Sequence, residues 1–323
     1  MKKALITGIT GMDGSHMADF LLAKGYDVYG LERYKSAGSD YTNIASILDK
    51  ITLIKGDLLD TASLLKALEI SEPDEVYNFA AQSFVGSSWD IAEYTGNVTG
   101  LGVLRLLEAI KAFDSSNKIK LAQASSSEMF GKRGVDADEY TTFRPESPYA
   151  IAKIFAHHTV HTFRNARGMF ACCSICFNHE SERRGYQFVT RKISNGAAKI
   201  LLGLADTLSL GNLDAARDWG DAPEYVEGIW KMLQYNEPTD FVFATGQSHT
   251  VAEFVDVAFN YIGIPDWKRY IIQDKRFMRP ADVNLIRGNF TRAKHYLGWE
   301  PRTDFPNLVR KMVDNDVQLL NRS

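Results

Sequence analysis

Three glycines near the start of the chain constrain its fold more than any other feature. Gly8, Gly11 and Gly14 follow a short apolar run at 3–7 and precede an amphipathic helical pattern at about 14–24. A sharp turn from strand to helix with this spacing requires glycine, because side chains would block the turn and hold the helix away from the strand. The chain is therefore expected to begin with a strand, a glycine turn and a helix.

Strand and helix patterns alternate after this turn. Short apolar runs that indicate buried strands occur at 27–31, 51–54, 75–79, 119–124 and about 170–177, and helical patterns lie between them at about 61–70, 97–112 and 149–167. This alternation predicts an α/β fold, with a Rossmann-type, doubly wound parallel sheet and helices on both faces. Beyond this point the pattern loosens, with helices expected at about 188–203, 222–235, 250–262 and 306–320 and short strands at 207–210 and 241–245.

The second half of the chain is not separated from the first by any linker rich in proline, glycine or serine. We therefore expect it to form a smaller, interleaved α/β substrate lobe against the carboxyl edge of the sheet. The Rossmann domain is expected to comprise 1–176 and about 212–245, and the lobe about 177–211 and 246–323.

Charge and hydropathy exclude several classes of protein. A net charge of −3 over 323 residues gives no electrostatic basis for binding nucleic acid or an anionic membrane surface. No apolar run is long enough to span a bilayer, and the apolar stretch after the first lysines is too short for a signal peptide. We expect a cytoplasmic protein.

Three neighbouring cysteines raise the question of a metal site. Cys172, Cys173 and Cys176 all lie in the strand expected at about 170–177. In a strand, Cys172 and Cys176 are roughly 13 Å apart on one face, and Cys173 points to the other. Three thiols in this arrangement cannot converge on one ion, so we expect buried core cysteines and no metal.

The glycine turn points to a bound dinucleotide. The start of a helix offers free N–H groups and the positive end of its dipole to a phosphate, and ligands of doubly wound sheets lie outside the carboxyl ends of the strands. The cofactor contacts expected at this turn are Gly8, Gly11, Met12, Asp13 and Gly14.

The end of the second strand bears on which dinucleotide binds. An acidic residue there binds the ribose hydroxyls of NAD, whereas an arginine binds the 2′-phosphate of NADP. This chain offers both, as Glu32 and Arg33, and the two residues leave the choice between NADP and NAD open. Further cofactor contacts are expected after the third and fourth strands, at Asp57, Leu58, Phe79, Ala80, Ala81, Gln82 and Ser83.

A tyrosine and a lysine suit the chemistry of hydride transfer. Tyr149 and Lys153 are four residues apart in "ESPYAIAKIFAHH" and share one face of the predicted helix. An ammonium beside a phenol favours the phenolate and lowers its pKa, which makes a base able to take a hydroxyl proton. The motif alone is common by chance, but downstream of a glycine turn and five alternating strands it is specific.

One apolar strand ends in three hydroxyls and an acid, in "LAQASSSEMFG" at 121–131. Serines end many strands simply by hydrogen bonding to the backbone. The alternative is that Glu128 and a serine hydroxyl point into a site.

At this point the chain resembles the extended short-chain dehydrogenase/reductase superfamily. The motifs "NHESERRG" (178–185), "FVTRKIS" (188–194), "LGNLDAARDWG" (210–220), "YVEGIWKMLQ" (225–234) and "RPADVN" (279–284) narrow the resemblance to the GDP-mannose 4,6-dehydratase family. A further segment, "LGWEPRTDF" (297–305), is common to many sugar-nucleotide enzymes of this class. The resemblance covers nearly the whole chain, with the motifs in the order of the family.

The resemblance implies a redox-neutral dehydration of a GDP sugar. Tyr149, helped by Lys153, would take the proton of the 4-hydroxyl while hydride leaves C4, and Glu128 would then remove the C5 proton. Ser126, where the family usually has threonine, would help to position the departing 6-hydroxyl before hydride returns to C6. An acid that first accepts and then returns a proton needs a pKa near neutrality, which a closed, dry cleft can supply.

The family also implies contacts to both ligands and an oligomer. Tyr94, His179 and Arg184 are implied as cofactor contacts. The implied GDP-sugar contacts are Ser83, Asn178, Val189, Lys192, Arg217, Arg279 and Asp282, together with Ser126, Glu128 and Tyr149. Related enzymes form homodimers or homotetramers through two long helices of each subunit, here the patterns at 97–112 and 149–167.

Several residues depart from the family pattern. Arg33 is followed by Tyr34 where a second arginine is usual, in a loop that holds the 2′-phosphate and joins subunits. Glu182 replaces a usual proline and Ala216 a common lysine, near the expected diphosphate and sugar. These departures keep a GDP-manno-heptose 4,6-dehydratase as an alternative. A GDP-4-keto-6-deoxyhexose reductase is a second, although it has no need of Glu128. A dinucleotide-sensing regulatory protein would have no use for the four catalytic residues.

Overall fold

The computed structural model describes residues 1–34, 40–133, 135–278 and 285–322. The predicted sheet is present and has seven parallel strands in the order β12-β7-β5-β4-β1-β2-β3. Its strands are β1 (Lys3–Thr7), β2 (Asp27–Glu32), β3 (Thr52–Lys55), β4 (Glu75–Asn78), β5 (Lys120–Ala124), β7 (Phe170–Cys176) and β12 (Phe241–Phe243). This confirms the predicted α/β, Rossmann-type fold, and every strand predicted for the sheet is found within one or two residues of its expected bounds.

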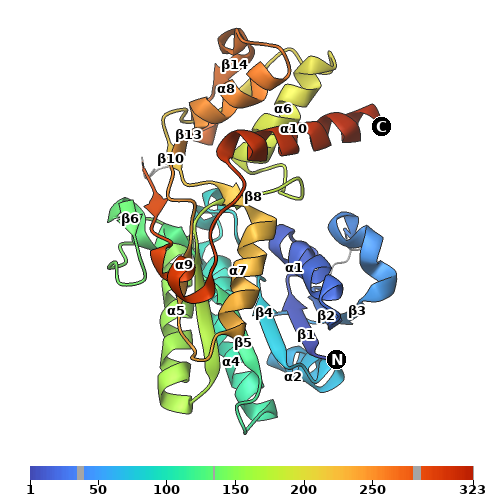
Figure 1. Cartoon of the computed structure of the whole chain (residues 1–323), viewed down its shortest axis with the longest axis vertical. Coiled ribbons are helices and arrows are strands. Elements are labelled where there is room, and N and C mark those ends of the chain that lie inside the picture. Colours follow the sequence, from blue (N-terminus) through green and yellow to red (C-terminus); the bar gives the residue numbers. More distant parts are fainter. Residues whose placement is uncertain (35–39, 134, 279–284, 323) are drawn as a thin grey trace.

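Helices cover both faces of the sheet (Figure 1). Helices α1 (Met12–Ala23) and α7 (Ala222–Gln234) pack on one face, and α2 (Thr61–Ser71), α4 (Gly102–Phe113) and α5 (Pro148–Arg167) pack on the other. Because successive side chains of a strand point to opposite faces, Ala4 and Ile6 contribute to the first core and Leu5 to the second. The sheet is buried on both faces, which explains why its strands read as continuous apolar runs.

Helix α5 carries its own start and stop signals. The Ser147 side chain accepts a hydrogen bond from the backbone N–H of Ala150, Pro148 occupies the first turn, and Gly168 follows the last turn with φ of 67°. Serine caps the free N–H groups, proline fits where no backbone donor is needed, and glycine adopts the left-handed conformation that ends a helix. These signals place Tyr149 at the first turn of α5, beside the carboxyl edge of the sheet.

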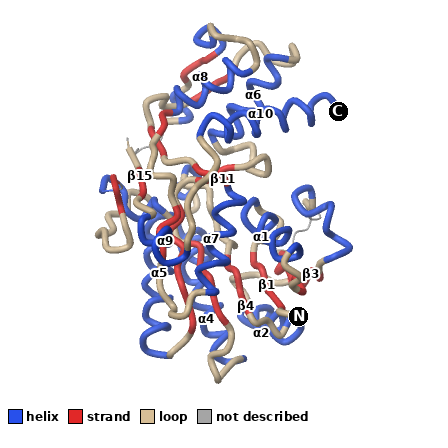
Figure 2. The backbone as a smooth tube through the Cα atoms, viewed as in Figure 1, coloured by secondary structure: helices blue, strands red, loops and turns tan. Residues whose placement is uncertain are grey.

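A second part of the chain, above the sheet in Figure 2, is built around its own group of helices. Helices α6 (Val189–Leu201), α8 (Val251–Tyr261) and α10 (Phe305–Asn321) share an apolar core of their own. The short strands pair as β9 (Leu208–Leu210) with β14 (Ile271–Gln273), β10 (Ala216–Arg217) with β13 (His249–Thr250), β11 (Gly220–Asp221) with β8 (His179–Glu180), and β15 (Arg287–Gly288) with β6 (Val135–Ala137).

The prediction of one continuous helix at 97–112 is wrong. The helical segment begins earlier, as α3 (Ala92–Thr95), continues as a π-helical turn η3 (Gly96–Leu101), and only then becomes α4. A Cβ atom at Gly100 would lie 3.4 Å from the Ala152 carbonyl oxygen of α5, so this turn packs backbone against backbone. The apolar pattern alone does not reveal such an irregular turn.

Several shorter elements were not predicted. They are the 3₁₀ helices η1 (Thr42–Lys50), η2 (Gly86–Trp89), η4 (Ser127–Arg133), η5 (Trp267–Tyr270) and η6 (Lys275–Phe277), the helix α9 (Thr291–Leu297), and the two- or three-residue strands β6, β8, β10, β11, β13, β14 and β15. Elements this short carry too little periodicity to be read from a sequence.

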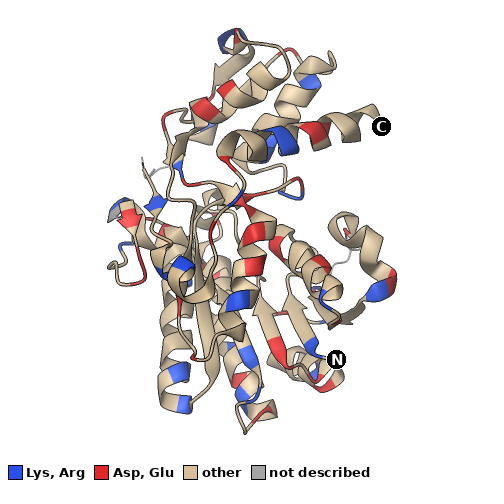
Figure 3. Cartoon of the chain, in the orientation of Figure 1, with Lys and Arg blue, Asp and Glu red and all other residues tan. Residues whose placement is uncertain are grey.

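The predicted arrangement of the cysteines is confirmed. Cys172 and Cys176 lie in the core that α1 and α7 cover, Cys173 lies in the opposite core, and all three thiols are free and buried. Among the residues that the structure describes, no cluster of three potential ligands could hold a metal ion. In the described parts of the chain, no helix has the length and apolarity needed to cross a membrane. Acidic and basic residues are interspersed over both parts of the chain (Figure 3).

Candidate active site

A cavity of about 420 Å³ opens at the carboxyl ends of the sheet strands. Many of the predicted site residues line it, namely Gly8, Gly11, Met12, Asp13, Gly14, Glu32, Arg33, Asp57, Leu58, Phe79, Ala80, Ala81, Ser83, Ser126, Glu128, Tyr149, Lys153, Asn178, His179 and Arg184. They come from the loops after β1 to β5 and β7, from the start of α5, and from the segment that follows β8. Residues from distant parts of the chain, from Gly8 to Arg184, thus line one cavity at the edge where doubly wound sheets bind ligands.

The glycine turn has the geometry of a phosphate cradle. Gly8 has a φ of 71°, and a Cβ atom there would lie 2.9 Å from the backbone nitrogen of Ala80. A Cβ atom at Gly14 would lie 2.7 Å from the Cα atom of Ile9. Gly11 caps the start of α1 and donates its N–H to the Gly8 carbonyl at 2.9 Å. The turn therefore fits a dinucleotide pyrophosphate, because its three glycines and the start of α1 line the cavity and offer backbone N–H groups and the positive end of the helix dipole.

An ion pair joins this turn to the segment after β7. His179 Nε2 lies 3.0 Å from Asp13 Oδ1, and its Nδ1 donates to the Phe177 carbonyl at 2.8 Å. Burial favours the neutral imidazole, but Asp13 outweighs it and raises the pKa of His179. Burial likewise opposes the ionised carboxyl of Asp13, but His179 and Arg184 lower its pKa to about 2. Both groups are therefore held in their charged forms at the floor of the cavity.

Two further side chains present polar atoms to the cavity. Arg184 Nε donates to Glu180 Oε2 at 2.6 Å while its guanidinium lies 4.5 Å from the centroid of the Phe188 ring. Asn178 Oδ1 is buried and has no hydrogen-bond partner among the described residues. A buried acceptor without a partner is costly unless a ligand donates to it. Asn178 therefore fits the predicted contact with a bound ligand.

Tyr149 and Lys153 lie on one face of α5 and are both buried in the cavity wall. Lys153 Nζ donates to the Ala124 carbonyl at 2.6 Å and lies 5.7 Å from the centroid of the Tyr149 ring. Burial lowers the pKa of Lys153 to about 8. The predicted lowering of the pKa of Tyr149 is wrong. Burial raises this pKa, the interaction with the Ser126 hydroxyl offsets it only in part, and the charge of Glu128 adds to the increase.

Ser126 and Glu128 follow β5 and line the same cavity. The Glu128 N–H donates to Ser126 Oγ at 3.2 Å, which forms a tight turn at the end of the strand. The hydroxyl of Ser126 lowers the pKa of the Tyr149 phenol by hydrogen bonding, and the charge of Glu128 raises it. The strand that ends in three serines and an acid therefore places all four of these residues in the cavity wall.

The predicted ribose residues differ in their surroundings. Glu32 is buried, and its carboxylate accepts hydrogen bonds from the Tyr41 hydroxyl at 2.9 Å and pairs with Lys55 Nζ at 2.8 Å. Arg33 is exposed and donates from Nη1 to the Tyr94 hydroxyl at 2.6 Å. Tyr94 itself is absent from the described cavity lining and reaches it through Arg33.

Other predicted site residues lie outside the cavity lining that the structure describes. Gln82 binds its own loop, donating to the Phe84 carbonyl at 3.1 Å and to Ser87 Oγ at 2.8 Å. Val189 begins α6, Lys192 places Nζ 3.2 Å from the centroid of the Phe277 ring, and Arg217 is buried in β10. Their roles stay predictions. Arg279 and Asp282 fall outside the described residues.

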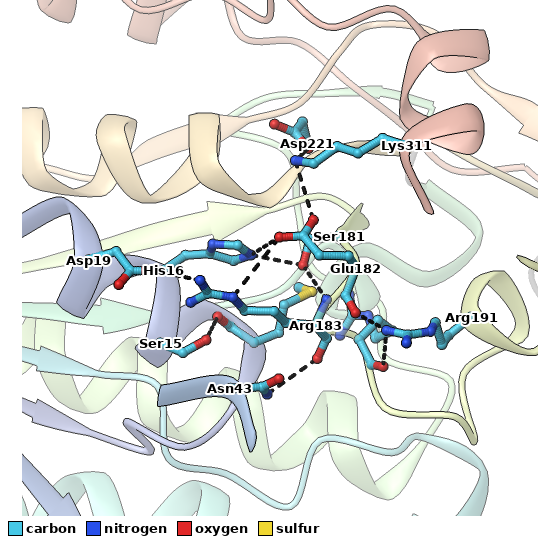
Figure 4. A network of polar contacts seen from close by, with 12 residues as sticks. Ser15, His16, Asp19, Asn43, Ser181, Glu182, Arg183, Arg191, Asp221 and Lys311 are labelled. Carbon is cyan, nitrogen blue, oxygen red and sulfur yellow. Dashed lines mark hydrogen bonds and ion pairs between the residues drawn. The ribbon is translucent and has the colours of Figure 1, made fainter. Parts of the chain in front are cut away.

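Glu182, expected near the diphosphate and sugar, is bound by charged side chains of the protein itself. Figure 4 shows its carboxylate between α1 and α10, with Oε1 3.9 Å from His16 Nε2 and Oε2 3.4 Å from Lys311 Nζ. Lys311 also pairs with Asp221 Oδ1 at 2.9 Å. Glu182 is absent from the described cavity lining, and its influence on the size of the sugar stays a prediction.

Sequence reasoning missed several residues of the cavity wall. They are Thr10, Leu31, Gly56, Phe84, Val85, Val98, Ala124, Ser125, Ser127, Cys176, Phe177, Glu180, Phe188 and Ile229. Most are apolar or contribute backbone, and no residue type marks them in the sequence. Ser125 and Ser127 belong to the quoted run of serines, where position directly after a strand was an available signal.

The seven-stranded parallel sheet, the glycine turn and the Tyr149–Lys153 pair at one cavity define an extended short-chain dehydrogenase/reductase. Comparison with known proteins agrees. The family model described as GDP-mannose 4,6 dehydratase matches residues 5–312. GDP-mannose 4,6 dehydratase 1 of Arabidopsis thaliana is 48% identical, over 99% of this chain and 91% of its own. The human GDP-mannose 4,6 dehydratase is 47% identical, over 98% of this chain and 92% of its own.

A solved structure supports the fold and the kind of cofactor. The UDP-glucose 4-epimerase of Thermus thermophilus, in complex with NAD, superposes with a TM-score of 0.85 at 25% identity, covering 98% of this chain and 99% of its own. The chain belongs to the GDP-mannose 4,6-dehydratase family. It is thus a sugar-nucleotide dehydratase that uses a nicotinamide cofactor, which confirms the resemblance predicted from the sequence.

Proposed function

We propose that the cavity converts GDP-mannose to GDP-4-keto-6-deoxymannose and water, with NADP as the cofactor. The observation that carries the proposal is that Glu128 lines the same cavity as Tyr149 and Lys153. An oxidation or reduction at C4 requires only the tyrosine and the lysine. A carboxylate beside them supplies the base that removal of the C5 proton requires.

The first step takes place at C4 of the sugar. A bound oxidised nicotinamide supplies the hydride acceptor for C4, the hydride donor for C6 and a positive charge that favours the Tyr149 phenolate. Tyr149 takes the proton of the 4-hydroxyl as the C4–H bond breaks. Lys153, whose pKa of about 8 lies near neutrality, stabilises the phenolate and adjusts its own protonation readily.

The second step removes water across C5 and C6. The new 4-ketone acidifies the C5 proton, and the Glu128 carboxylate accepts it. Glu128 then donates this proton to the departing 6-hydroxyl, which Ser126 holds, so that water leaves. Tyr149 returns its proton to C5 when C6 receives hydride. The reaction therefore loses one water, with no net change in the cofactor.

The surroundings of Glu32 and Arg33 support NADP over NAD. The Glu32 carboxylate is already bound by Tyr41 and Lys55, and burial fixes it in place. Arg33 is exposed at the cavity edge, where a guanidinium binds a 2′-phosphate by charge and by paired hydrogen bonds.

The remaining assignments form part of the same proposal. Asn178, Val189, Lys192, Arg217, Arg279 and Asp282 would bind the GDP end of the substrate. The Rossmann domain would comprise 1–176 and about 212–245, with 177–211 and 246–323 as the GDP-sugar lobe. Homologous subunits would pair through α4 and α5 as a homodimer or homotetramer. A cytoplasmic location stays a prediction.

A Glu128→Gln variant tests the chemistry. Purified enzyme is incubated with GDP-mannose and either NADP or NAD, while mass spectrometry follows water loss and absorbance follows reduced nicotinamide. For the wild type we expect water loss without net reduced cofactor, and faster with NADP. Glu128→Gln should slow water loss by about 100-fold or more, because one general base is typically worth about 10²–10⁴ in rate. Reduced nicotinamide should then accumulate up to the amount of enzyme.

Glu69→Gln, at an exposed position of α2, is the matched control and should leave both signals unchanged. Full turnover by Glu128→Gln would show the scheme to be wrong. No water loss from GDP-mannose, together with oxidation of NADPH when GDP-4-keto-6-deoxymannose is supplied, would indicate a reductase.

A further inference from the structure

Ser125 has no role in the chemistry proposed above, although it is buried in the cavity wall directly before Ser126. Its backbone N–H donates to the Ser174 carbonyl of β7 at 2.8 Å. Its hydroxyl lies 3.1 Å from Nδ1 of His157, which is also buried. The first serine of the run therefore points away from the substrate side and into α5.

His157 continues the line of catalytic residues on α5. It follows Lys153 by four residues and Tyr149 by eight, so all three lie on one face of the helix. Burial lowers the pKa of His157 to about 4, so the ring is neutral near pH 7. A neutral ring can accept a hydrogen from Ser125 at Nδ1 while its Nε2–H faces the carboxylate of Asp240, 4.0 Å away.

Other residues around His157 fix the position of its imidazole ring. Asp240 accepts two hydrogen bonds from the Arg164 guanidinium, at 2.7 and 2.9 Å, and a third from the backbone N–H of Cys173 at 2.7 Å. The Phe143 ring packs edge-on against the imidazole, with 5.1 Å between centroids. His157 is thus fixed by β7, by the segment before β12 and by its own helix.

We propose that His157, acting through Ser125, is a positioning residue that fixes the Ser126–Glu128 turn relative to Tyr149 and Lys153. The catalytic groups come from two elements, the turn after β5 and the helix α5. Side-chain contacts bridge them: the Tyr149 phenol with the Ser126 hydroxyl, Lys153 Nζ with the Ala124 carbonyl, and His157 with Ser125. The inference rests on the proposed function for the roles of Ser126 and Glu128.

This coupling has a different effect on each step. Oxidation at C4 depends on Tyr149 and Lys153, which α5 carries whether or not the contact with Ser125 exists. Removal of water depends on Glu128, which sits on the turn that Ser125 anchors. A displacement of about 1 Å can cost roughly 100-fold in rate. Loss of the contact should therefore slow elimination more than oxidation.

Four variants and one control separate the effect on oxidation at C4 from the effect on water removal. Ser125→Ala and His157→Phe each remove the hydrogen bond, and the double variant tests whether both act through it. His157→Asn is the conservative replacement, because the asparagine amide reaches about the position of Nδ1. His161→Gln, at an exposed position of the same helix, is the matched control. Single turnovers with GDP-mannose report the appearance of reduced nicotinamide and the loss of water separately.

We expect Ser125→Ala and His157→Phe to slow water loss by about 10- to 100-fold, with reduced nicotinamide accumulating and KM for the sugar nucleotide changed less than threefold. The double variant should be no slower than the slower single variant. His157→Asn should recover most of the rate, and His161→Gln should match the wild type. Additive losses, equal slowing of both steps, or an unaffected His157→Phe would overturn the proposal.

Hydrogen–deuterium exchange keeps this test independent of the activity. In the absence of substrate, peptides that cover 125–131 should exchange faster in Ser125→Ala and His157→Phe than in the wild type, while peptides from α5 stay unchanged. Unaltered exchange at 125–131 would overturn the coupling. If both variants exchange faster at 125–131 but the wild type removes no water from GDP-mannose, the proposed function is overturned and the coupling stands.

Discussion

At Gly14 the fold has no room for a single additional atom. A Cβ atom would meet the backbone of Gly8 and Ile9, which cannot move without opening the turn between β1 and α1. Close packing of this kind turns a one-atom change into a shift of the whole helix start. The cavity floor, formed by the same turn, would shift with it.

We therefore expect Gly14→Ala to lower the free energy of unfolding by about 1–3 kcal/mol and to weaken binding of NADP. Ala23→Ser, which adds one atom at an exposed position of the same helix, is the matched control and should change stability by less than about 0.5 kcal/mol. Urea unfolding and NADP titration by fluorescence measure the two effects. A Gly14→Ala protein with wild-type stability would contradict the packing argument.

The protonation of Tyr149 shows what one residue's surroundings add to a motif. The spacing of Tyr149 and Lys153 indicated a shared helix face, and the structure confirms it. The spacing says nothing of desolvation, which here raises the pKa of the phenol and lowers that of the ammonium. The sequence shows that a lysine lies one helical turn from Tyr149, but it does not show how deeply the two side chains are buried.

Among the elements, α6 and α10 are joined by a buried carboxylate. Asp316 is fully buried on α10 and accepts hydrogen bonds from Arg191 Nε at 2.9 Å and Ser194 Oγ at 2.6 Å, both on α6. Arg191 is itself buried. Removing one partner of such a pair leaves an uncompensated charge in a site without water.

Asp316→Ala should accordingly destabilise the chain by about 3–5 kcal/mol. Asp314→Ala, two residues away on the exposed side of α10, removes a carboxylate that accepts a hydrogen bond from the Tyr261 hydroxyl, and it should cost less than about 1 kcal/mol. Urea unfolding midpoints followed by circular dichroism measure both. If the two variants unfold alike, the buried pair does not support the packing of α10 on α6.

The π-helical turn η3 is an element that the spacing of apolar residues did not predict. Apolar spacing at 97–112 predicted one helix, and the chain instead forms α3, a π-helical turn and α4. The turn lies against α5, and its shape follows from backbone packing at Gly100. Helical periodicity records which face is buried, but it does not record how closely a neighbouring helix approaches.

For the whole molecule, the two parts of the chain meet through a polar network as well as at the cavity (Figure 4). Arg183 pairs with Asp19 of α1 at 2.5 Å, and Lys311 of α10 pairs with Glu182 and Asp221. These contacts fix the segment that also carries His179 and Arg184 into the cavity. The position of the lobe over the sheet and the shape of the cofactor site are therefore determined together.

The outer face of α5 bears on assembly. Ile151 and Phe155 are 59% and 44% exposed there, beside Leu101 of η3 at 41%. A contiguous exposed apolar surface of this kind is typical of an interface between subunits. The proposed pairing through these helices would cover it.

We expect the wild type to elute as a dimer or tetramer and Ile151→Glu to elute as a smaller species, because a buried carboxylate without a partner is costly. Ile70→Glu, at a 46% exposed position of α2, is the matched control and should keep the wild-type mass. Size-exclusion chromatography with light scattering distinguishes the cases. A wild-type monomer, or an unchanged mass for Ile151→Glu, would contradict assembly through this face.

The sequence by itself determined the alternation of strands and helices, the glycine turn, the opposite faces of the three cysteines and the residues of the catalytic motifs. These features are local, because periodicity, turn chemistry and short motifs act within one or two elements. Only the tertiary structure decided that Glu182 faces α10, that Glu32 is already bound by Tyr41 and Lys55, and that burial raises the pKa of Tyr149. Each of these depends on groups brought together from distant parts of the chain, and on the exclusion of water that follows.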